Sequence, residues 1–215
     1  MADAVLIHNR FAERLQPERT SVVLVDCQAR LVDQFCAAPE ALRDNLLGLA
    51  RLARAFSMPI VIGTRRGAAY GPLLAELAQE TAGAWTVERP SGRFWDHAAS
   101  VAAVRACGRR DLLVAGIDPD SGLAGLSLGA REEGFAVQVV ADAAAGGTPS
   151  SERIGVARMS EAGIRVTSWV AVMAEFASAT PTKPAPADSA ALSDSLARYP
   201  ADETGWGRTR ITRFA

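Results

Sequence analysis

Residues that commonly build metal, disulfide and redox sites are scarce in this chain. The two histidines, His8 and His97, lie far apart and have no acidic cluster beside them, which argues against a built-in zinc site. The three cysteines, Cys27, Cys36 and Cys107, cannot all pair and show no C-x-x-C spacing. Because no signal peptide is apparent at the N-terminus either, we expect a reducing, cytoplasmic location. We expect neither a metal ion nor another cofactor.

Excess charge and long apolar runs are also missing. The 23 lysines and arginines against 24 aspartates and glutamates leave a net charge of −1, without the basic excess typical of nucleic-acid binders. No apolar run approaches the ~20 residues that span a membrane. Hydrophobic residues nevertheless make up 49% of the 215 residues, which is enough to build a sizeable core. The expected partner is therefore a small molecule rather than a nucleic acid or a membrane.

The chain does contain a regular alternation of short apolar runs and helical patterns. The runs are apolar throughout, as in strands buried on both faces of a parallel sheet, and occupy residues 21–25, 59–63, 111–115, 136–140 and 164–168. Stripes near the 3.6-residue helical repeat occupy residues 40–56, 71–80, 96–107, 121–133 and 150–162. The alternation predicts an α/β fold in which helices cover both faces of a doubly wound, mostly parallel sheet.

The composition changes near residue 180. Residues 1–179 carry the alternating pattern and are expected to form one α/β domain, whereas residues 180–187 (TPTKPAPA) read as an extended proline-rich linker. Residues 188–199 can form one more helix. The region 180–215 is therefore predicted to be a linker and C-terminal arm, either packed on a neighbouring subunit or frayed.

Asp26 stands directly after the first apolar run, in the stretch VVLVDCQARL. In open α/β sheets, ligands bind beyond the carboxyl ends of the strands, so a carboxyl group at this position is suited to proton transfer. The alternative is that Asp26 only caps the helix or turn that follows.

The segment AGIDPDSGL, residues 115–123, predicts a tight turn from a strand into a helix that begins near Ser121. The backbone N–H groups of Ser121, Gly122 and Leu123 would then lie at a helix N-terminus, where such donors stabilise an anion or oxyanion. The alternative is an ordinary turn in which Asp120 or Ser121 is the N-cap.

A third candidate region is the loop ERPSGRFWD, residues 88–96. Arg89 could supply a fixed cation, and Phe94 and Trp95 could form walls around a substrate. The alternative is a surface loop that is held in place by its aromatic residues.

In their order and spacing, these segments resemble the isochorismatase-like (cysteine hydrolase) family. The resemblance runs from about Leu15 to Phe176 and rests on PERTSVVLVDCQ, MPIVIGT, ERPSGRFWDH, the block from GRRDLLVAGIDPDSGL to VVADAAAG, and RMSEAGIRVTSW. It implies a three-layer α/β/α fold, a homo-oligomer and an activity on a small organic molecule.

The resemblance also assigns residues to the site. The family's aspartate falls on Asp26, its lysine or arginine on Arg89 and its nucleophilic cysteine on Gly122. The peptide bond that is cis in relatives falls between Asp118 and Pro119. The expected substrate contacts are Asp118, Pro119, Asp120, Ser121, Phe94 and Trp95.

Glycine at position 122 excludes the family's covalent mechanism at that residue, because it has no nucleophilic side chain. Isochorismatases also have glycine there and are thought to protonate their substrate with the aspartate. The resemblance therefore implies non-covalent acid–base catalysis by Asp26, in a hydrolysis or in a lyase, isomerase or cyclisation step of a specialised pathway. Two alternatives stay open: a binding or scaffold protein that has lost its chemistry, and an amidase with an unexpected nucleophile.

Overall fold

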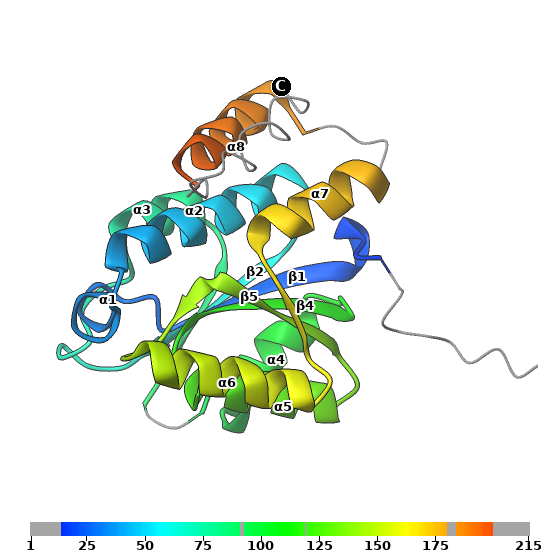
Figure 1. Cartoon of the computed structure of the whole chain (residues 1–215). Coiled ribbons are helices and arrows are strands. Elements are labelled where there is room, and N and C mark those ends of the chain that lie inside the picture. Colours follow the sequence, from blue (N-terminus) through cyan, green and yellow to red (C-terminus); the bar gives the residue numbers. More distant parts are fainter. Residues whose placement is uncertain (1–13, 91–92, 119, 180–183, 200–215) are drawn as a thin grey trace, which may run out of the picture.

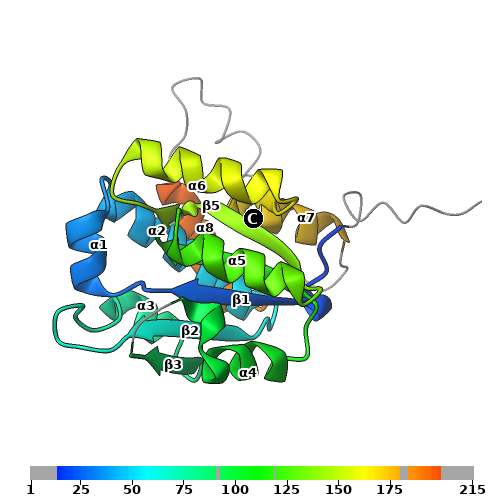
Figure 2. The ribbon, with the colours of Figure 1, turned by 90° about the horizontal axis from the view of Figure 1, so that it is seen from below.

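The computed structural model of the chain describes residues 14–90, 93–118, 120–179 and 184–199. They form three layers, in which a central sheet lies between two groups of helices (Figure 1). Helices α2 and α7 cover one face of the sheet, and α4, α5 and α6 cover the other. Helix α8 lies outside α2, and α1 lies beyond one end of the sheet (Figure 2).

Six parallel strands build the sheet, in the order β3-β2-β1-β4-β5-β6. Strands β1 and β4 are buried at every position, because they pair on both sides and are covered on both faces. The chain order reverses between β1 and β4, which creates the switch point where sheets of this type bind ligands. The predicted doubly wound parallel sheet is confirmed. The strands are β1 (Thr20–Val25), β2 (Ile60–Arg65), β3 (Trp85–Arg89), β4 (Asp111–Ile117), β5 (Ala136–Ala145) and β6 (Arg165–Thr167).

Strand β3 is the one strand of this sheet that the apolar runs do not predict. It pairs only with β2, and Trp85, Thr86 and Glu88 are exposed. Its sequence, WTVER, therefore lacks the continuous apolar character of the central strands.

The helices match the predicted helical patterns, with α1 and α7 added. They are α1 (Ala29–Phe35), α2 (Pro39–Ala55), α3 (Ala75–Glu80), α4 (Ala98–Ala106), α5 (Gly122–Glu132), α6 (Pro149–Glu161), α7 (Trp169–Ala179) and α8 (Pro186–Arg198). Short 3-10 helices span Pro17–Arg19 and Phe94–Asp96. Within the described residues, no helix combines the length and the apolar character that crossing a membrane requires.

The sheet separates two hydrophobic cores. The larger core lies beneath α2 and α7 and is centred on Trp169, the largest fully buried side chain. A Cβ atom at Gly48 would lie 2.7 Å from the Trp169 ring, so α2 approaches this ring only because residue 48 is glycine. The second core joins the other face of the sheet to α4, α5 and α6 and includes Phe94. Both cores pack against the strands whose carboxyl ends form the candidate site.

The predicted helix over 188–199 is present as α8, and its described residues pack on α2 of the same chain. Leu192 and Leu196 are buried there as part of the larger core. The contact of this arm with a neighbouring subunit stays a prediction. Residues 200–215 lie outside the described part of the chain.

Candidate functional site

Four adjacent strands place charged side chains at their carboxyl ends. Arg89 ends β3, Arg65 ends β2, Asp26 follows β1 and Asp118 follows β4. Arg65 and Arg89 are register partners in the pairing of β2 with β3. Because the strands are parallel, their carboxyl ends lie on the same side of the sheet, and residues far apart in the sequence meet there.

Asp26 and Arg89 form a fully buried ion pair. Arg89 Nη1 donates to Asp26 Oδ1 at 2.7 Å, and Nη2 donates to Oδ2 at 2.6 Å. The side chains of Asp26 and Arg89 are 0% and 1% exposed. This two-pronged geometry fixes the carboxylate in both position and orientation. The structure thus brings together two of the three residues that the resemblance assigned to catalysis.

Arg65 is a second guanidinium on the same carboxylate, and the sequence analysis missed it. Its Nε donates to Asp26 Oδ2 at 2.8 Å, and its Nη2 lies 3.9 Å from Asp118 Oδ2. The guanidinium carbon lies 5.8 Å from the centre of the Tyr70 ring, and the side chain is 30% exposed. A charged residue after an apolar run is the signal that found Asp26, but after the run at 59–63 it points to Arg65 and Arg66 alike.

The backbone at these strand ends adopts conformations that non-glycine residues seldom occupy. Asp26 has a φ of 61° and Asp118 a φ of 70°. Between them, β4 approaches β1 so closely that a Cβ atom at Gly116 would lie 2.0 Å from the carbonyl oxygen of Val25. Left-handed backbone at non-glycine residues concentrates at functional sites, although aspartate tolerates it better than most residues.

Asp118 and Asp120 lie in the turn before α5 and differ in proton affinity. Burial opposes the ionisation of Asp118, but hydrogen bonds with Asp120, Ser121 and the Gly122 amide, together with the Arg65 charge, outweigh it and lower the Asp118 pKa. The hydrogen bond with Asp118 is the main reason why the pKa of Asp120 is raised.

The amides at the start of α5 are already engaged within the turn. The N–H groups of Ser121 and Leu123 donate to the Asp118 carbonyl at 3.4 and 2.9 Å. The Ser121 hydroxyl donates to Asp118 Oδ2 at 2.5 Å, and the Gly122 amide also interacts with this carboxylate. In this state the helix N-terminus therefore holds the side chain of Asp118. A role of these amides in stabilising a substrate anion stays a prediction.

Position 122 has space for a side chain. A Cβ atom there would lie 3.6 Å from Asp118 Cβ, 3.6 Å from the Ile117 carbonyl oxygen and 3.7 Å from Asp118 Oδ2, all ordinary contacts. Gly122 is not among the glycines with positive φ. Neither packing nor backbone conformation therefore requires glycine at this position.

The three cysteines lack the lowered thiol pKa that marks an activated nucleophile. Burial, then the charge of Asp26, raises the pKa of the fully buried Cys27, whose thiol donates weakly to the Val25 carbonyl. Burial also raises the pKa of Cys36 and Cys107. Nucleophilic cysteines instead have a lowered pKa.

The aromatic residues of the 88–96 loop separate in the structure. Phe94 is fully buried, and a Cβ atom at Gly63 would lie 2.5 Å from its ring and 3.7 Å from Arg89 Nη1. Trp95 packs on Gly129 of α5 and on Phe135, with its ring nitrogen donating to Glu133. Because Gly129 lies seven residues beyond Gly122, Trp95 contacts α5 about 10 Å further along the helix.

Phe94 thus packs on β2 at Gly63, close to Arg89, whereas Trp95 packs on α5. Their contacts with a substrate stay predictions, as do those of Asp118, Asp120 and Ser121. Pro119 lies outside the described residues. Among the described residues, no group of three or more His, Cys, Asp or Glu side chains is arranged to hold a metal ion.

Comparisons with known proteins agree with this architecture. Residues 20–171 match the family model described as the Isochorismatase domain. The chain is 33% identical over 166 residues to the probable hydrolase YcaC of Escherichia coli (strain K12). The matched region covers 76% of this chain and 80% of that protein.

Two solved structures of this group are similar over nearly their whole length. YcaC from Pseudomonas aeruginosa, with hexane-2,5-diol and covalent acrylamide, has a TM-score of 0.81 and 31% identity and covers 94% of this chain and 98% of that one. The YcaC gene product from Escherichia coli, described as an octameric hydrolase of unknown specificity, has a TM-score of 0.78 and 30% identity and covers 94% and 96%.

Proposed function

Because the chain belongs to the isochorismatase family, we propose that it is an enzyme that acts on a small organic molecule by non-covalent acid–base catalysis centred on Asp26. The observation that carries this proposal is the placement of a fully buried carboxylate, with left-handed backbone, where the ends of β1, β2 and β3 meet. The reaction is a hydrolysis, or a lyase, isomerase or cyclisation step that uses the same proton transfer.

In this mechanism Arg89 is a positioning residue. Both of its Nη groups donate to Asp26, and it is almost fully buried, so it holds the carboxylate rather than the substrate. The carboxylate accepts three hydrogen bonds from Arg65 and Arg89 and has about four acceptor sites in all. About one acceptor site therefore remains on Asp26 for a hydrogen bond from a substrate or a water molecule.

No covalent intermediate is expected at position 122. Covalent acrylamide is present in the Pseudomonas aeruginosa relative, whereas Gly122 offers no side-chain atom for such an adduct. The raised pKa values of Cys27, Cys36 and Cys107 also disfavour a thiolate elsewhere. Alkylation with iodoacetamide is therefore expected to leave turnover unchanged, and inactivation that maps to one cysteine would contradict the non-covalent mechanism.

One observation favours a second candidate function, that of a binding or scaffold protein. Both oxygens of Asp26 are engaged by arginines and the residue is fully buried, which is also how a purely structural ion pair looks. Under this alternative, no small molecule is turned over and Asp26→Asn changes only stability.

We also propose that the protein is a homo-oligomer. The support is the Escherichia coli relative, which is described as octameric and is similar over 94% of this chain. Light scattering on the purified full chain tests this. A mass several times that of one 22.6 kDa chain is expected, whereas a monomer at micromolar concentration would contradict it.

The catalytic proposal is tested by turnover of a panel of small amides, esters and enol ethers, followed by nuclear magnetic resonance. Asp26→Asn is expected to reduce turnover by at least about a hundredfold, the usual contribution of a general acid or base. Asp33→Asn is the matched control, because Asp33 is exposed and pairs only with the partly exposed Arg43 among the described residues. Equal turnover in wild type and a folded Asp26→Asn variant would exclude the role of Asp26.

A further inference from the structure

We propose, resting on the function above, that Arg65 binds a carboxylate group of the substrate and so determines its specificity. Of the two arginines that contact Asp26 in the described part of the chain, Arg65 combines a fixed position with access to solvent, since its side chain is 30% exposed while Arg89 is 1% exposed. Arg65 is therefore the part of the Asp26 ion-pair cluster that a molecule in solution can contact.

The charges at the site leave Arg65 only partly compensated. Asp26 carries one negative charge, and Arg89 engages both of its oxygens. Arg65 adds a second positive charge through one hydrogen bond to the same carboxylate. Around Asp26 two guanidinium groups thus face one carboxylate, so the counter-charge for Arg65 comes from Asp118 or from an incoming anion.

Asp118 supplies only part of the missing charge. Its Oδ2 lies 3.9 Å from Arg65 Nη2, well beyond the 2.7–2.9 Å typical of a charge-assisted hydrogen bond. The same oxygen accepts the Ser121 hydroxyl at 2.5 Å. Asp118 is thus held by its own turn, and a ligand carboxylate can approach Arg65 more closely than Asp118 does.

The hydrogen-bond donors of Arg65 are suited to this role. A guanidinium has five N–H donors, and in the described part of the chain only Nε of Arg65 donates a hydrogen bond. Its two Nη groups present the parallel donor pair that matches a carboxylate. The Tyr70 ring, 5.8 Å from the guanidinium carbon, adds an apolar surface beside this pair.

Arg65 is also held in place before any ligand arrives. The buried Gln28 accepts a hydrogen bond from the Arg65 amide at 2.7 Å and donates to the Arg65 carbonyl at 3.1 Å. The second hydrogen of the Gln28 amide group reaches the Gly71 carbonyl at 2.7 Å. A fixed backbone and a fixed Nε lower the entropy cost of binding an anion.

The test uses three flat probes of similar size and different charge on the full-length protein: benzoate, benzamide and benzamidine. Calorimetric titration is expected to show binding of benzoate, at least about tenfold weaker binding of neutral benzamide, and no binding of the cation benzamidine. Binding of benzamidine in preference to benzoate would overturn the proposal, because the carboxyls of Asp118 and Asp120 would then dominate. Absence of benzoate binding at millimolar concentration would overturn it as well.

Variants locate the binding to Arg65. Arg65→Met is expected to weaken benzoate binding by at least about tenfold, whereas Arg65→Lys retains part of it. Arg66→Met is the matched control, because the Arg66 side chain is exposed and pairs with Glu88. Unchanged benzoate affinity in Arg65→Met would overturn the proposal. If that variant does not fold, the relative affinities of the three probes for the wild-type protein serve as the test.

The outcome is independent of the catalytic proposal, because the titration requires no turnover. Benzoate binding through Arg65 without turnover of any substrate would contradict only the proposed function. Turnover that depends on Asp26 without a preference for benzoate would contradict only the role of Arg65.

Discussion

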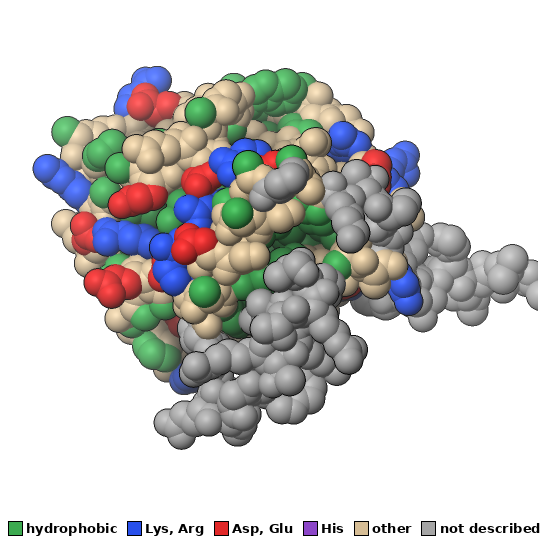
Figure 3. Space-filling view, turned by 90° about the horizontal axis from the view of Figure 1, so that it is seen from above, with side chains coloured by type: hydrophobic (Ala, Val, Ile, Leu, Met, Phe, Trp, Pro, Cys, Tyr) green, Lys and Arg blue, Asp and Glu red, His purple; other side chains and the backbone are tan. Residues whose placement is uncertain are grey.

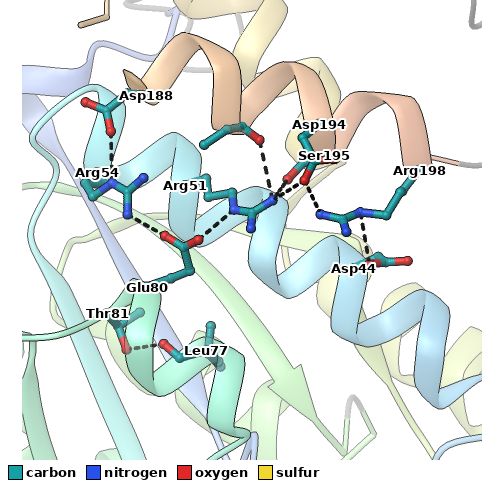
Figure 4. Close-up of polar contacts among 11 residues, drawn as sticks. Asp44, Arg51, Arg54, Leu77, Glu80, Thr81, Asp188, Asp194, Ser195 and Arg198 are labelled. Atoms are coloured by element: carbon teal, nitrogen blue, oxygen red, sulfur yellow. Dashed lines mark hydrogen bonds and ion pairs between the residues drawn. The ribbon is translucent and has the colours of Figure 1, made fainter. Parts of the chain in front are cut away.

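Two arginine–carboxylate networks in this molecule have similar chemistry and opposite surroundings. The site cluster consists of Asp26, Arg65, Arg89 and Asp118 and lies at the ends of the strands, with its central pair fully buried. The arm network lies on the outer face of α2, where acidic and basic side chains gather beside one another (Figure 3). It joins α2, α3 and α8 through Asp44, Arg51, Arg54, Glu80, Asp188, Asp194, Ser195 and Arg198 (Figure 4).

The comparison teaches what each network can do. Glu80 accepts hydrogen bonds from Arg51 at 2.8 Å and Arg54 at 2.5 Å, and both arginines also reach α8. Asp194 is 58% exposed, so water and salt screen its ion pairs. The buried pair of Asp26 and Arg89 is not screened in this way, and removing one partner leaves a charge in the interior. We therefore expect the arm network to affect local docking and the site cluster to affect the whole fold.

The largest expected effect is that of Arg89→Met. This change leaves the buried Asp26 with Arg65 alone and is expected to lower the free energy of unfolding by about 3 kcal/mol, because an incompletely paired charge remains inside. The double variant Asp26→Asn with Arg89→Met should recover part of this loss. Urea denaturation measures both, and a loss below about 1 kcal/mol for Arg89→Met would mean that water reaches the pair.

A smaller effect is expected from Glu80→Gln in the arm network. The amide keeps the shape but loses the charge that Arg51 and Arg54 share, so α8 should dock less firmly, at a cost of about 1 kcal/mol. Limited proteolysis near residues 184–186 should speed up by several-fold. Glu88→Gln is the control, because Glu88 is exposed and pairs with the exposed Arg66.

The two networks should also differ in how salt changes the effect of a substitution. In about 1 M sodium chloride the difference between Glu80→Gln and wild type should shrink, whereas the difference for Arg89→Met should persist. If salt changed both differences equally, the contrast between a screened and an unscreened network would be wrong.

The sequence predicts these two regions to different degrees. The helix of the arm is visible as a pattern over 188–199, but its partners on α2 and α3 are far away in the sequence and no local signal names them. Asp26 can be found because it ends a continuous apolar run, and Arg89 because it lies in the charged and aromatic loop of residues 88–96 and matches the basic residue of the family. The strand that carries Arg89 is an edge strand with exposed residues, so no apolar run reveals it.

Arg65 shows most clearly where sequence reasoning ends. It lies in the stretch GTRR, beside a second arginine of identical chemistry. Only the pairing of β2 with β1 and β3 directs Arg65 to Asp26 and leaves Arg66 with Glu88 at the surface. Likewise, the sequence leaves open whether the amides of Ser121 and Leu123 face a ligand or belong to an ordinary turn, and only the structure shows both donating to the Asp118 carbonyl.

Asp142 on β5 extends the comparison to a carboxyl held by a backbone amide instead of a guanidinium. The Trp169 amide donates to its Oδ1 at 3.2 Å. Burial raises the pKa of Asp142, and hydrogen bonds with Trp169 and Tyr199 only partly offset this effect. Since the folded chain then binds this proton more tightly than the unfolded chain, stability falls as the pH rises from the ordinary carboxyl range through the raised pKa.

Asp142→Asn is therefore expected to have the smallest effect, and one of opposite sign. At about pH 7 it removes a buried charge while keeping an oxygen for the Trp169 amide, so the free energy of unfolding should rise by roughly 0.5 kcal/mol. The gain should shrink as the pH falls toward the ordinary carboxyl range, because the raised pKa makes folded wild-type Asp142 take up its proton before the unfolded chain does. Asp33→Asn, at an exposed position, should show no gain at either pH. A loss of stability at neutral pH would show that the charge of Asp142 is needed, as that of Asp26 is, to hold the groups around it.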